Sequence, residues 1–230
     1  MKICSYSDKG SRPSNQDQIA YKQFDEKNAV FVVADGMGGY SYGDLAAKCV
    51  TETIMSAVED NWNVMSPQRV LSESIKKANA QLELERLSLG VSSMGAVVVT
   101  LYVSGNNAYV AWLGDSRLYQ YREGRQIFCT EDNTYVNEVI KKQPRYSQKD
   151  FEKYSSIVTR AIMGDDTLGE VVPNTLGVQT DDVFVLCTDG YHKGFNVANL
   201  VNDEQVAMKG IEESVSKAED NVSFIKIVMN

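Results

Sequence analysis

The sequence lacks the features that mark several large classes of protein. No stretch of its 230 residues approaches the roughly 20 consecutive apolar side chains that span a bilayer, so we expect no membrane segment. The opening residues, Met1–Asp8, are too polar for a secretory signal peptide, which makes the cytoplasm the expected location. A basic surplus is also missing, because the formal net charge is -8. This acidity argues against a nucleic-acid partner, since lysine and arginine supply most of the affinity for phosphates.

Cysteine and proline are both scarce. The four cysteines form no CxxC pair and no metal-ligand spacing; they are Cys4, Cys49, Cys129 and Cys187. The last three lie in or beside apolar runs, which predicts buried free thiols in a reducing compartment. The four prolines are spread thinly, and no Pro/Gly-rich linker interrupts the chain. We therefore expect a single domain over residues 1–230.

Apolar runs typical of β-strands are the commonest pattern in the chain. Two pairs of runs flank short turn signals, Ser104–Asn107 and Glu123-Gly124, and these pairs predict β-hairpins. The many hairpins favour mainly antiparallel sheets. The predicted strands are Asn28–Ala34, Ala96–Val103, Ala108–Leu113, Ser116–Tyr121, Arg125–Cys129, Val183–Thr188 and Val222–Met229.

Helical spacing is clearest in two long segments, from about Tyr42 to Asn61 and from about Pro67 to Leu87. Ser66 is suited to cap the second segment, and Pro67 to its first position. Weaker helices are expected over Gln148–Tyr154 and Asp203–Ala218. The apolar faces of the two long helices are predicted from Leu45, Cys49, Ile54 and Val58, and from Leu71, Ile75, Ala78 and Leu82. Two packed sheets with helices outside would bury all of these faces, so we predict an α+β sandwich.

Five aspartates stand where apolar runs begin or end: Asp17, Asp35, Asp115, Asp189 and Asp220. Two of them are followed by glycine, in Asp35-Gly36 and Asp189-Gly190, and such a glycine leaves room for a close approach to the backbone. Several carboxylates at one sheet edge would repel each other unless hard cations, which prefer oxygen ligands, lie between them. Each Asp-Gly pair taken alone is more often a plain turn, so the hypothesis depends on the set.

The ordered set of motifs resembles the metal-dependent protein phosphatases, the protein phosphatase 2C-like family, in their compact bacterial form. The resemblance extends from Ser7 to Val228. It is carried by Arg12–Asp17, by VADGMGG at Val33–Gly39, by SMGA at Ser93–Ala96, by LGDSRLY at Leu113–Tyr119, by TEDN at Thr130–Asn133, by VTRA at Val158–Ala161, by LCTDG at Leu186–Gly190 and by DNVS at Asp220–Ser223.

This resemblance implies a four-layer αββα sandwich of two mainly antiparallel sheets flanked by helices. It also implies two Mn²⁺ or Mg²⁺ ions between the sheets, and phosphoprotein substrates made by a Ser/Thr kinase. Carried over residue by residue, Asp35 would bridge both metals, with the Gly36 carbonyl on one of them. Asp189 and Asp220 would hold the first metal, and Asp17 would act near the second.

Two further roles follow from the same resemblance. Arg12 would bind the substrate phosphate, because its planar guanidinium matches phosphate oxygens. Asp115, together with Asp189, would form a weaker third metal site. Arg12, Asp35 and Asp189 are the residues expected to support catalysis. The segment Pro144–Ser156 falls where a flap beside the site is expected.

The chain departs from the family pattern at three positions. Gln16 replaces a metal-binding glutamate, Asn133 replaces a histidine, and Met37 replaces a histidine of eukaryotic members, although Met is usual in bacterial ones. We expect Met37 and Tyr40 to line the turn. The single histidine, His192, is interpreted as a surface loop residue, with proton donation to the leaving group as the alternative.

We therefore expect hydrolysis of phosphoserine and phosphothreonine in proteins, by a water that bridges two metals. Two alternatives remain at this point. One is a catalytically impaired adaptor of the same fold that binds phosphoproteins or a kinase, which Gln16 and Asn133 favour. The other is a phosphatase that acts on small phosphate esters.

Overall fold

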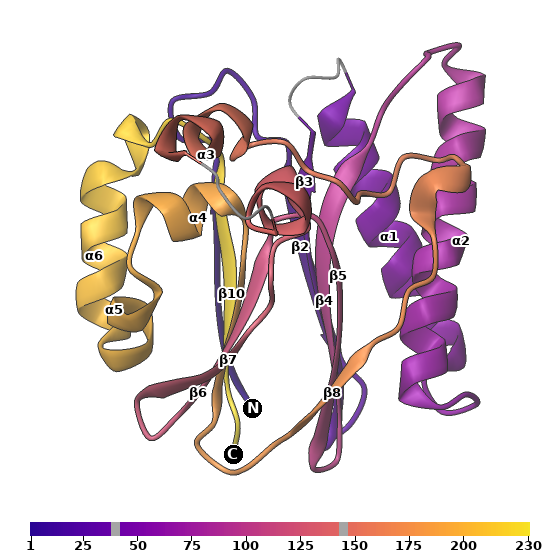
Figure 1. Cartoon of the computed structure of the whole chain (residues 1–230). Helices are drawn as coiled ribbons and strands as arrows, with labels where there is room; N and C mark the ends of the chain where they lie inside the picture. Colours follow the sequence, from indigo (N-terminus) through magenta and orange to yellow (C-terminus); the bar gives the residue numbers. More distant parts are fainter. Residues whose placement is uncertain (38–41, 143–146) are drawn as a thin grey trace.

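The structure is a computed structural model, and it describes residues 1–37, 42–142 and 147–230. Two five-stranded sheets pack face to face, and helices cover both outer faces (Figure 1). All paired strands are antiparallel. The predicted α+β sandwich, with four layers in the order αββα, is confirmed.

The first sheet has the strand order β1-β10-β9-β6-β7. The chain ends pair with each other in it, because Lys2 lies opposite Val228. The predicted hairpin at Glu123-Gly124 is confirmed, and both residues have positive φ angles, 51° and 72°, as a tight hairpin turn requires. The strands are β1 (Lys2–Asp8), β10 (Val222–Val228), β9 (Val183–Cys187), β6 (Arg117–Arg122) and β7 (Arg125–Cys129).

The second sheet has the order β2-β3-β4-β5-β8. Its central strand β3 is apolar throughout because both of its faces are buried. Val30 and Val32 pack toward the helices, whereas Phe31 and Val33 pack toward the other sheet. The strands are β2 (Asp17–Gln23), β3 (Asn28–Gly36), β4 (Ala96–Ser104), β5 (Asn107–Leu113) and β8 (Asn174–Gly177).

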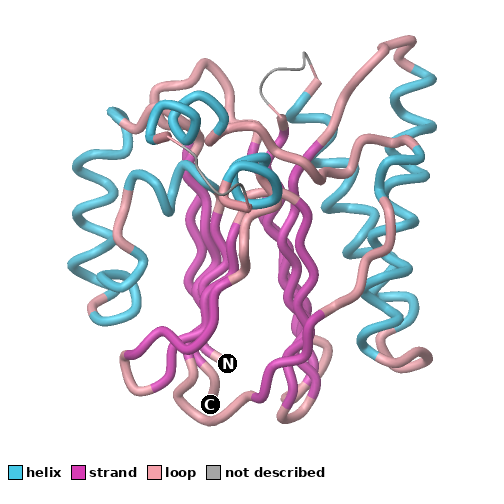
Figure 2. The backbone as a smooth tube through the Cα atoms, viewed as in Figure 1, coloured by secondary structure: helices cyan, strands magenta, loops and turns pink. Residues whose placement is uncertain are grey.

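Two long helices, α1 (Gly43–Asn61) and α2 (Pro67–Ser88), cover the second sheet (Figures 1 and 2). The buried face of α2 is the predicted one. Ser66 stands at its N-cap position, but its side chain donates or accepts no capping hydrogen bond. The predicted face of α1 is wrong at its start: Leu45 is 38% exposed, and Ala46, Ala47 and Val50 are buried instead. Small residues face the sheet there because β3 lies close beneath α1.

The other outer face carries α4 (Asp189–Gly194), α5 (Val197–Asn202), α6 (Glu204–Ser214) and the 3-10 turn η3 (Val215–Lys217). The predicted helix over Asp203–Ala218 corresponds to α6 and η3. The connection from β7 in the first sheet to β8 in the second contains the π-helix η1 (Val136–Ile140), α3 (Gln148–Tyr154) and the 3-10 turn η2 (Asp166–Leu168).

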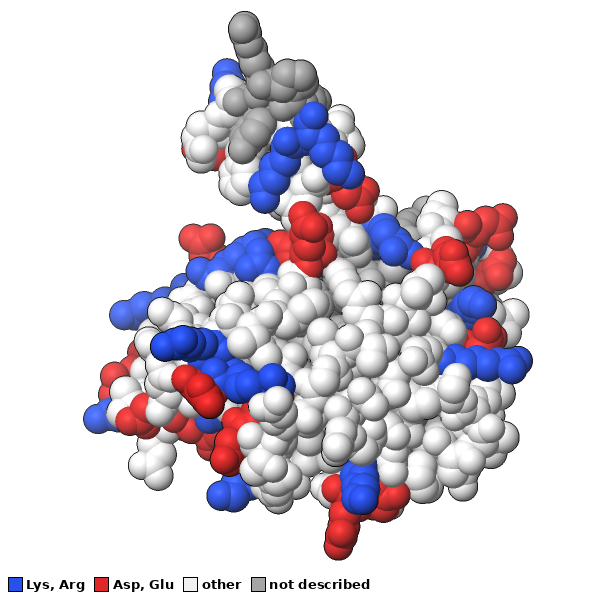
Figure 3. Space-filling model, turned by 60° about the horizontal axis from the view of Figure 1, so that its bottom comes forward, with Lys and Arg blue, Asp and Glu red and all other residues white. Residues whose placement is uncertain are grey.

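Two other expectations concern the surface and the thiols. In the described residues, no helix is long and apolar enough to cross a membrane. On the face drawn in Figure 3, Lys and Arg side chains alternate with Asp and Glu around a broad uncharged centre. All four cysteines are free; Cys187 is buried as predicted, while Cys49 and Cys129 are partly exposed.

Candidate active site

The predicted aspartates come together at one end of the two sheets. Asp17 begins β2, Asp35 lies next to the end of β3, and Asp115 follows β5; Asp189 begins α4 directly after β9, and Asp220 precedes β10. Because neighbouring strands are antiparallel, the end of one strand and the start of the next meet at the same edge. Four of the five line a cavity of about 560 Å³, together with Arg12, Gln16, Gly36, Met37, Ser156 and Asn221.

Asp17 and Asp35 are the most deeply placed pair. They lie directly opposite each other across β2 and β3. Asp17 is 3% exposed, and its Oδ2 accepts a hydrogen bond of 3.0 Å from Thr188 Oγ1. Its second oxygen, Oδ1, is buried without a hydrogen-bond partner. A buried carboxylate oxygen without a donor is costly, and a cation would satisfy it.

Burial and crowding both oppose ionisation of this pair. Burial, offset in part by hydrogen bonds from Ser223 and Thr188, and the charges of Asp189 and Asp220 raise the pKa of Asp17 to about 7. Burial, followed by the charge of Asp17, raises the pKa of Asp35 well above its ordinary value. The site concentrates negative charge that the protein's own cations only partly balance.

Two basic side chains neutralise the outer aspartates. Arg12 Nη2 donates to Asp220 Oδ2 at 3.0 Å, and both side chains are about half exposed at the mouth of the cavity. Lys193 Nζ donates to Asp189 Oδ2 at 2.7 Å and lies 3.6 Å from Asp115 Oδ2. Burial disfavours the ionised form of Asp189, but its neighbours, Lys193 foremost among them, together lower the pKa of Asp189.

Sequence reasoning missed Lys193. It follows Asp189 by four residues, so the pair shares one face of a helix. The short helix α4 was not expected, and the spacing of Asp189 and Lys193 therefore gave no indication of their contact.

Burial and the charge of Asp189 raise the pKa of Asp115 to about 6, although Lys193 acts in the opposite direction.

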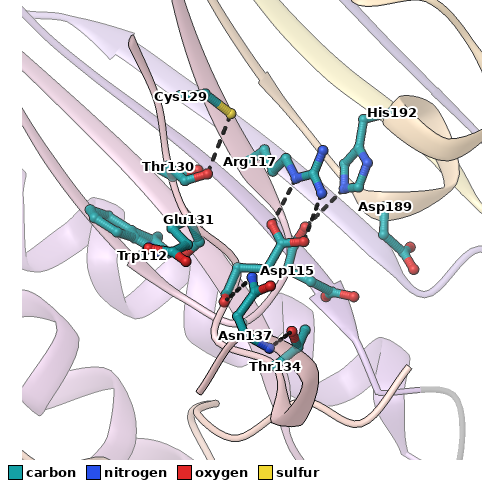
Figure 4. Close-up of polar contacts among 12 residues, drawn as sticks. Trp112, Asp115, Arg117, Cys129, Thr130, Glu131, Thr134, Asn137, Asp189 and His192 are labelled. Carbon is teal, nitrogen blue, oxygen red and sulfur yellow. Dashed lines mark hydrogen bonds and ion pairs between the residues drawn. The ribbon is translucent and has the colours of Figure 1, made fainter. Parts of the chain in front are cut away.

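The interpretation of His192 as a surface loop residue is wrong. It lies on α4, is partly buried, and its Nε2 is 2.9 Å from the Asp115 carbonyl oxygen (Figure 4). A carbonyl only accepts hydrogen bonds, so Nε2 carries the proton. Burial is the main cause that lowers the pKa of His192. The neutral imidazole holds the Asp115 backbone in place.

Asn133, the residue in place of the family's histidine, also fixes this loop. Its backbone N–H donates to the Gly114 carbonyl at 2.9 Å, and its Oδ1 accepts from the Gly114 N–H at 3.2 Å. Gly114 has φ +109°, and a Cβ there would lie 2.3 Å from the Val97 side chain. The adjacent Arg117 is held separately by two 2.7 Å hydrogen bonds to Asp132.

Asn221 holds the loop that carries Arg12. Its Nδ2 donates to the carbonyls of Lys9 and Ser14, at 2.9 and 3.0 Å, and its Oδ1 accepts from the Gln16 N–H at 2.8 Å. Asn221 is 5% exposed, so its buried side chain joins the segment before β10 to the segment between β1 and β2. The sequence motif contained Asn221, but nothing in its spacing indicated these partners.

The two glycines after the aspartates serve the chain itself. A Cβ on Gly36 would lie 2.0 Å from the Gly43 carbonyl oxygen, and one on Gly190 would lie 2.0 Å from the Asn221 carbonyl oxygen. These close approaches place α1 and the start of β10 against the site. We expected these glycines to leave room for a ligand. On the side where a Cβ would stand, backbone atoms of the chain fill that room instead.

Among the described residues, no three Asp, Glu, His or Cys side chains converge as a ready set of metal ligands. The donor chemistry nevertheless fits a hard cation, because four carboxylates line the cavity and Asp17, which lies opposite Asp35, has a buried Oδ1 without a hydrogen-bond partner. Gly38, Gly39 and Tyr40 lie outside the described residues, as do positions 144–146 of the expected flap. Ser156, at the end of that flap, lines the cavity.

The whole fold matches that of solved serine/threonine phosphatases. The structure of PstP/Ppp from Mycobacterium tuberculosis superposes with a TM-score of 0.82 at 22% identity, covering 100% of this chain and 99% of that one. A structure of the PstP catalytic domain in complex with two manganese ions gives a TM-score of 0.80 at 22% identity, over 100% and 98% of the chains. The chain thus has the fold of these solved structures.

The sequence matches one protein family over most of its length. Residues 6–223 match the family described as Protein phosphatase 2C. A protein phosphatase 2C-type protein of Streptococcus pyogenes is 30% identical over 237 residues, which cover 99% of this chain and 91% of that protein. The chain belongs to the protein phosphatase 2C family. The predicted family and enzyme class, a protein phosphatase, are confirmed.

Proposed function

We propose that the chain hydrolyses phosphoserine and phosphothreonine in proteins with the help of two Mn²⁺ or Mg²⁺ ions. The observation that carries the proposal is the meeting of five aspartates at one end of the two sheets, where four line a cavity and Asp17 keeps a buried oxygen without a hydrogen-bond partner. The serine/threonine phosphatases of similar fold, one of them holding two manganese ions, support the substrate class and the metal.

The residues that would hold the ions are Asp35, Asp189 and Asp220, with the Gly36 carbonyl and Asp17. When bound, such ions supply an acidified water as the nucleophile and neutralise charge on the phosphate. The expectation that Asp115 would bind a weaker third ion conflicts with the ammonium of Lys193, which lies 3.6 Å from Asp115 Oδ2. The chain's own part is to hold these carboxylates on the rigid ends of strands, so that little rearrangement is needed.

Arg12 is the group proposed to capture the phosphate. Its guanidinium lies at the cavity mouth, half exposed, and is paired with Asp220. An exposed ion pair of this kind contributes little, about 0–1 kcal/mol, so a phosphate dianion can compete for the guanidinium. Transfer of Arg12 from Asp220 to the substrate would leave the Asp220 carboxylate for a metal.

The test is phosphate release from a phosphothreonine peptide, measured with Mn²⁺ and again with excess chelator. We expect turnover only with the metal, and loss of turnover of at least about 100-fold in Asp189→Asn. Asp181→Asn, at an exposed turn away from the cavity, is the matched control and should keep full activity. Metal-independent turnover, or normal turnover in Asp189→Asn, would reject the mechanism.

The same assay separates the alternatives. A phosphopeptide that is hydrolysed much faster than a sugar phosphate supports a protein substrate made by a Ser/Thr kinase. A folded protein without turnover under several metals would instead favour the adaptor. The retention of Arg12, Asp35, Asp189 and Asp220 at one cavity argues for the enzyme.

A further inference from the structure

Lys193 contacts two of the site's carboxylates at once. Its Nζ is 2.7 Å from Asp189 Oδ2 and 3.6 Å from Asp115 Oδ2. The two carboxylates are mostly buried, with side-chain exposures of 19% and 9%, while the Lys193 side chain is 52% exposed. The ammonium therefore covers the acidic pair from the solvent side.

The position of Lys193 is built into the fold. Asp189 begins α4, and Lys193 follows one helical turn later on the same face. Asp115 arrives from the loop after β5, and the bond from His192 Nε2 to its carbonyl fixes that loop against α4. Arg117, two residues after Asp115 at the start of β6, is bound to Asp132. Among the ion pairs of the described residues, Lys193 alone contacts Asp115 and Asp189.

A divalent ion shared by these two carboxylates would meet the ammonium directly. Hard cations bind carboxylate oxygens at about 2.0–2.6 Å. Lys193 Nζ already hydrogen-bonds Asp189 Oδ2, so an ion on the same oxygen would lie only a few ångströms from a like charge. One ammonium and one divalent ion are therefore strong competitors for the pair.

We propose that Lys193 is a built-in cation for Asp115 and Asp189, and that it excludes a third metal ion from this pair. The proposal deepens the proposed function, because the two other ions belong to that function. Lys193 acts as a positioning residue here: it holds Asp189 and screens Asp115 without touching the substrate.

The experiment counts bound Mn²⁺ by equilibrium dialysis at saturating metal, without any substrate. We expect two ions on the unaltered chain and three on Lys193→Met, which keeps the apolar stem but removes the charge. Adding Asp115→Asn to Lys193→Met should return the count to two. Lys193→Arg keeps the charge and should also bind two.

Lys209→Met is the matched control, because Lys209 also makes an i,i+4 ion pair, with Glu213 on α6 at 3.9 Å. It should leave the count unchanged. Metal-free thermal unfolding provides a second readout. Lys193→Met should melt about 2–4 °C below the unaltered chain, because Asp115 and Asp189 then repel each other, and Mn²⁺ should remove that difference. The control should melt within about 1 °C of the unaltered chain.

Two results would overturn the proposal. One is a third ion on the unaltered chain that disappears in Asp115→Asn. The other is a Lys193→Met protein, folded by its thermal transition, that gains no ion. Failure of the proposed function is a separate outcome, since a chain that binds two ions but releases no phosphate leaves the Lys193 result standing. If the unaltered chain binds no Mn²⁺, the proposal still holds when Lys193→Met gains one ion that disappears on adding Asp115→Asn. It is overturned when Lys193→Met gains no ion.

Discussion

Single residues at the cavity have distinct tasks, and Arg12 is one whose side chain is half exposed to solvent. Its contact with Asp220 is weak enough to exchange, whereas its loop is fixed by Asn221. The guanidinium of Arg12 can thus exchange partners while the loop that carries it stays fixed. A phosphate group can recruit the guanidinium without a change in the backbone.

We expect Arg12→Ala to raise the KM for a phosphopeptide about 10- to 100-fold, because a charge-assisted contact to phosphate contributes about 1.5–3 kcal/mol. The count of bound Mn²⁺ should stay the same, since Arg12 is not a proposed metal ligand. Steady-state kinetics with a phosphothreonine peptide measure the first quantity, and dialysis measures the second. Arg12→Lys should recover part of the loss. An unchanged KM in Arg12→Ala would remove Arg12 from the substrate site.

Asp17 presents the opposite case, a buried charge that lacks full compensation. Asp17→Asn keeps the shape and removes the repulsion with Asp35. We expect the metal-free variant to melt at a higher temperature than the unaltered protein, while its affinity for Mn²⁺ falls about 10-fold or more. Thermal unfolding in chelator and a metal titration measure the two effects. A variant that is both less stable and unchanged in metal affinity would contradict this account.

At the scale of the elements, a buried carboxylate at the other end of β9 from the site joins neighbouring strands. Asp182, just before β9, is fully buried. It accepts two 2.8 Å hydrogen bonds from Arg122 at the end of β6, and others of 2.9 Å from Gln120 Nε2 and the Gln179 N–H. Burial alone would raise its pKa, but these donors, Arg122 first, lower the pKa of Asp182.

We expect Asp182→Asn to lower the free energy of unfolding by about 2–3 kcal/mol, because it removes the charge that balances the partly buried Arg122. A carboxyl with a lowered folded pKa stabilises the fold above the unfolded pKa of about 4, and this stabilisation disappears as the pH falls through the folded value. The difference between the two proteins should thus be constant above about pH 5 and shrink below it.

Urea unfolding at a series of pH values measures this difference. Asp181→Asn is the neighbouring control: Asp181 is exposed, has a φ of 65°, and asparagine tolerates that conformation. It should change stability by less than about 0.5 kcal/mol. A pH-independent difference for Asp182→Asn would show that shape, and not charge, decides the effect.

For the whole molecule, one end of the two sheets is acidic, because four aspartates line the cavity there. The rest of the interface is an apolar layer between the sheets, formed by residues such as Phe31, Leu101, Phe184 and Ile225. Stability at the acidic end therefore depends on cations, whereas stability below it depends on burial of apolar surface.

We accordingly expect Mn²⁺ at about 100 times its dissociation constant to stabilise the fold by roughly 2.7 kcal/mol per site, and excess chelator to reverse this. Differential scanning calorimetry with and without metal provides the measurement. Asp189→Asn should show a much smaller shift than the Asp181→Asn control. Equal shifts in both variants would mean that the metal acts elsewhere.

Much of the fold followed from local patterns. Long apolar runs indicated the strands β3, β4 and β5, and turn residues indicated the two hairpins. Helical spacing over about 20 residues indicated α1 and α2. The strands β1, β2 and β8 were missed because they lie at sheet edges, where polar and apolar residues mix. The helices α4 and α5 have six residues each, too few for helical spacing to be recognised.

The sequence by itself determined the family, the layered architecture and the aspartates of the candidate site, because these are carried by short motifs whose order is specific. Only the tertiary structure decided which groups meet there. Arg12 and Asp220 are 208 positions apart, and the position of Lys193 between Asp115 and Asp189 depends on a helix that packing creates. Antiparallel pairing brings the ends of strands that are distant in the sequence to one edge. Local spacing therefore does not indicate which of these residues come into contact.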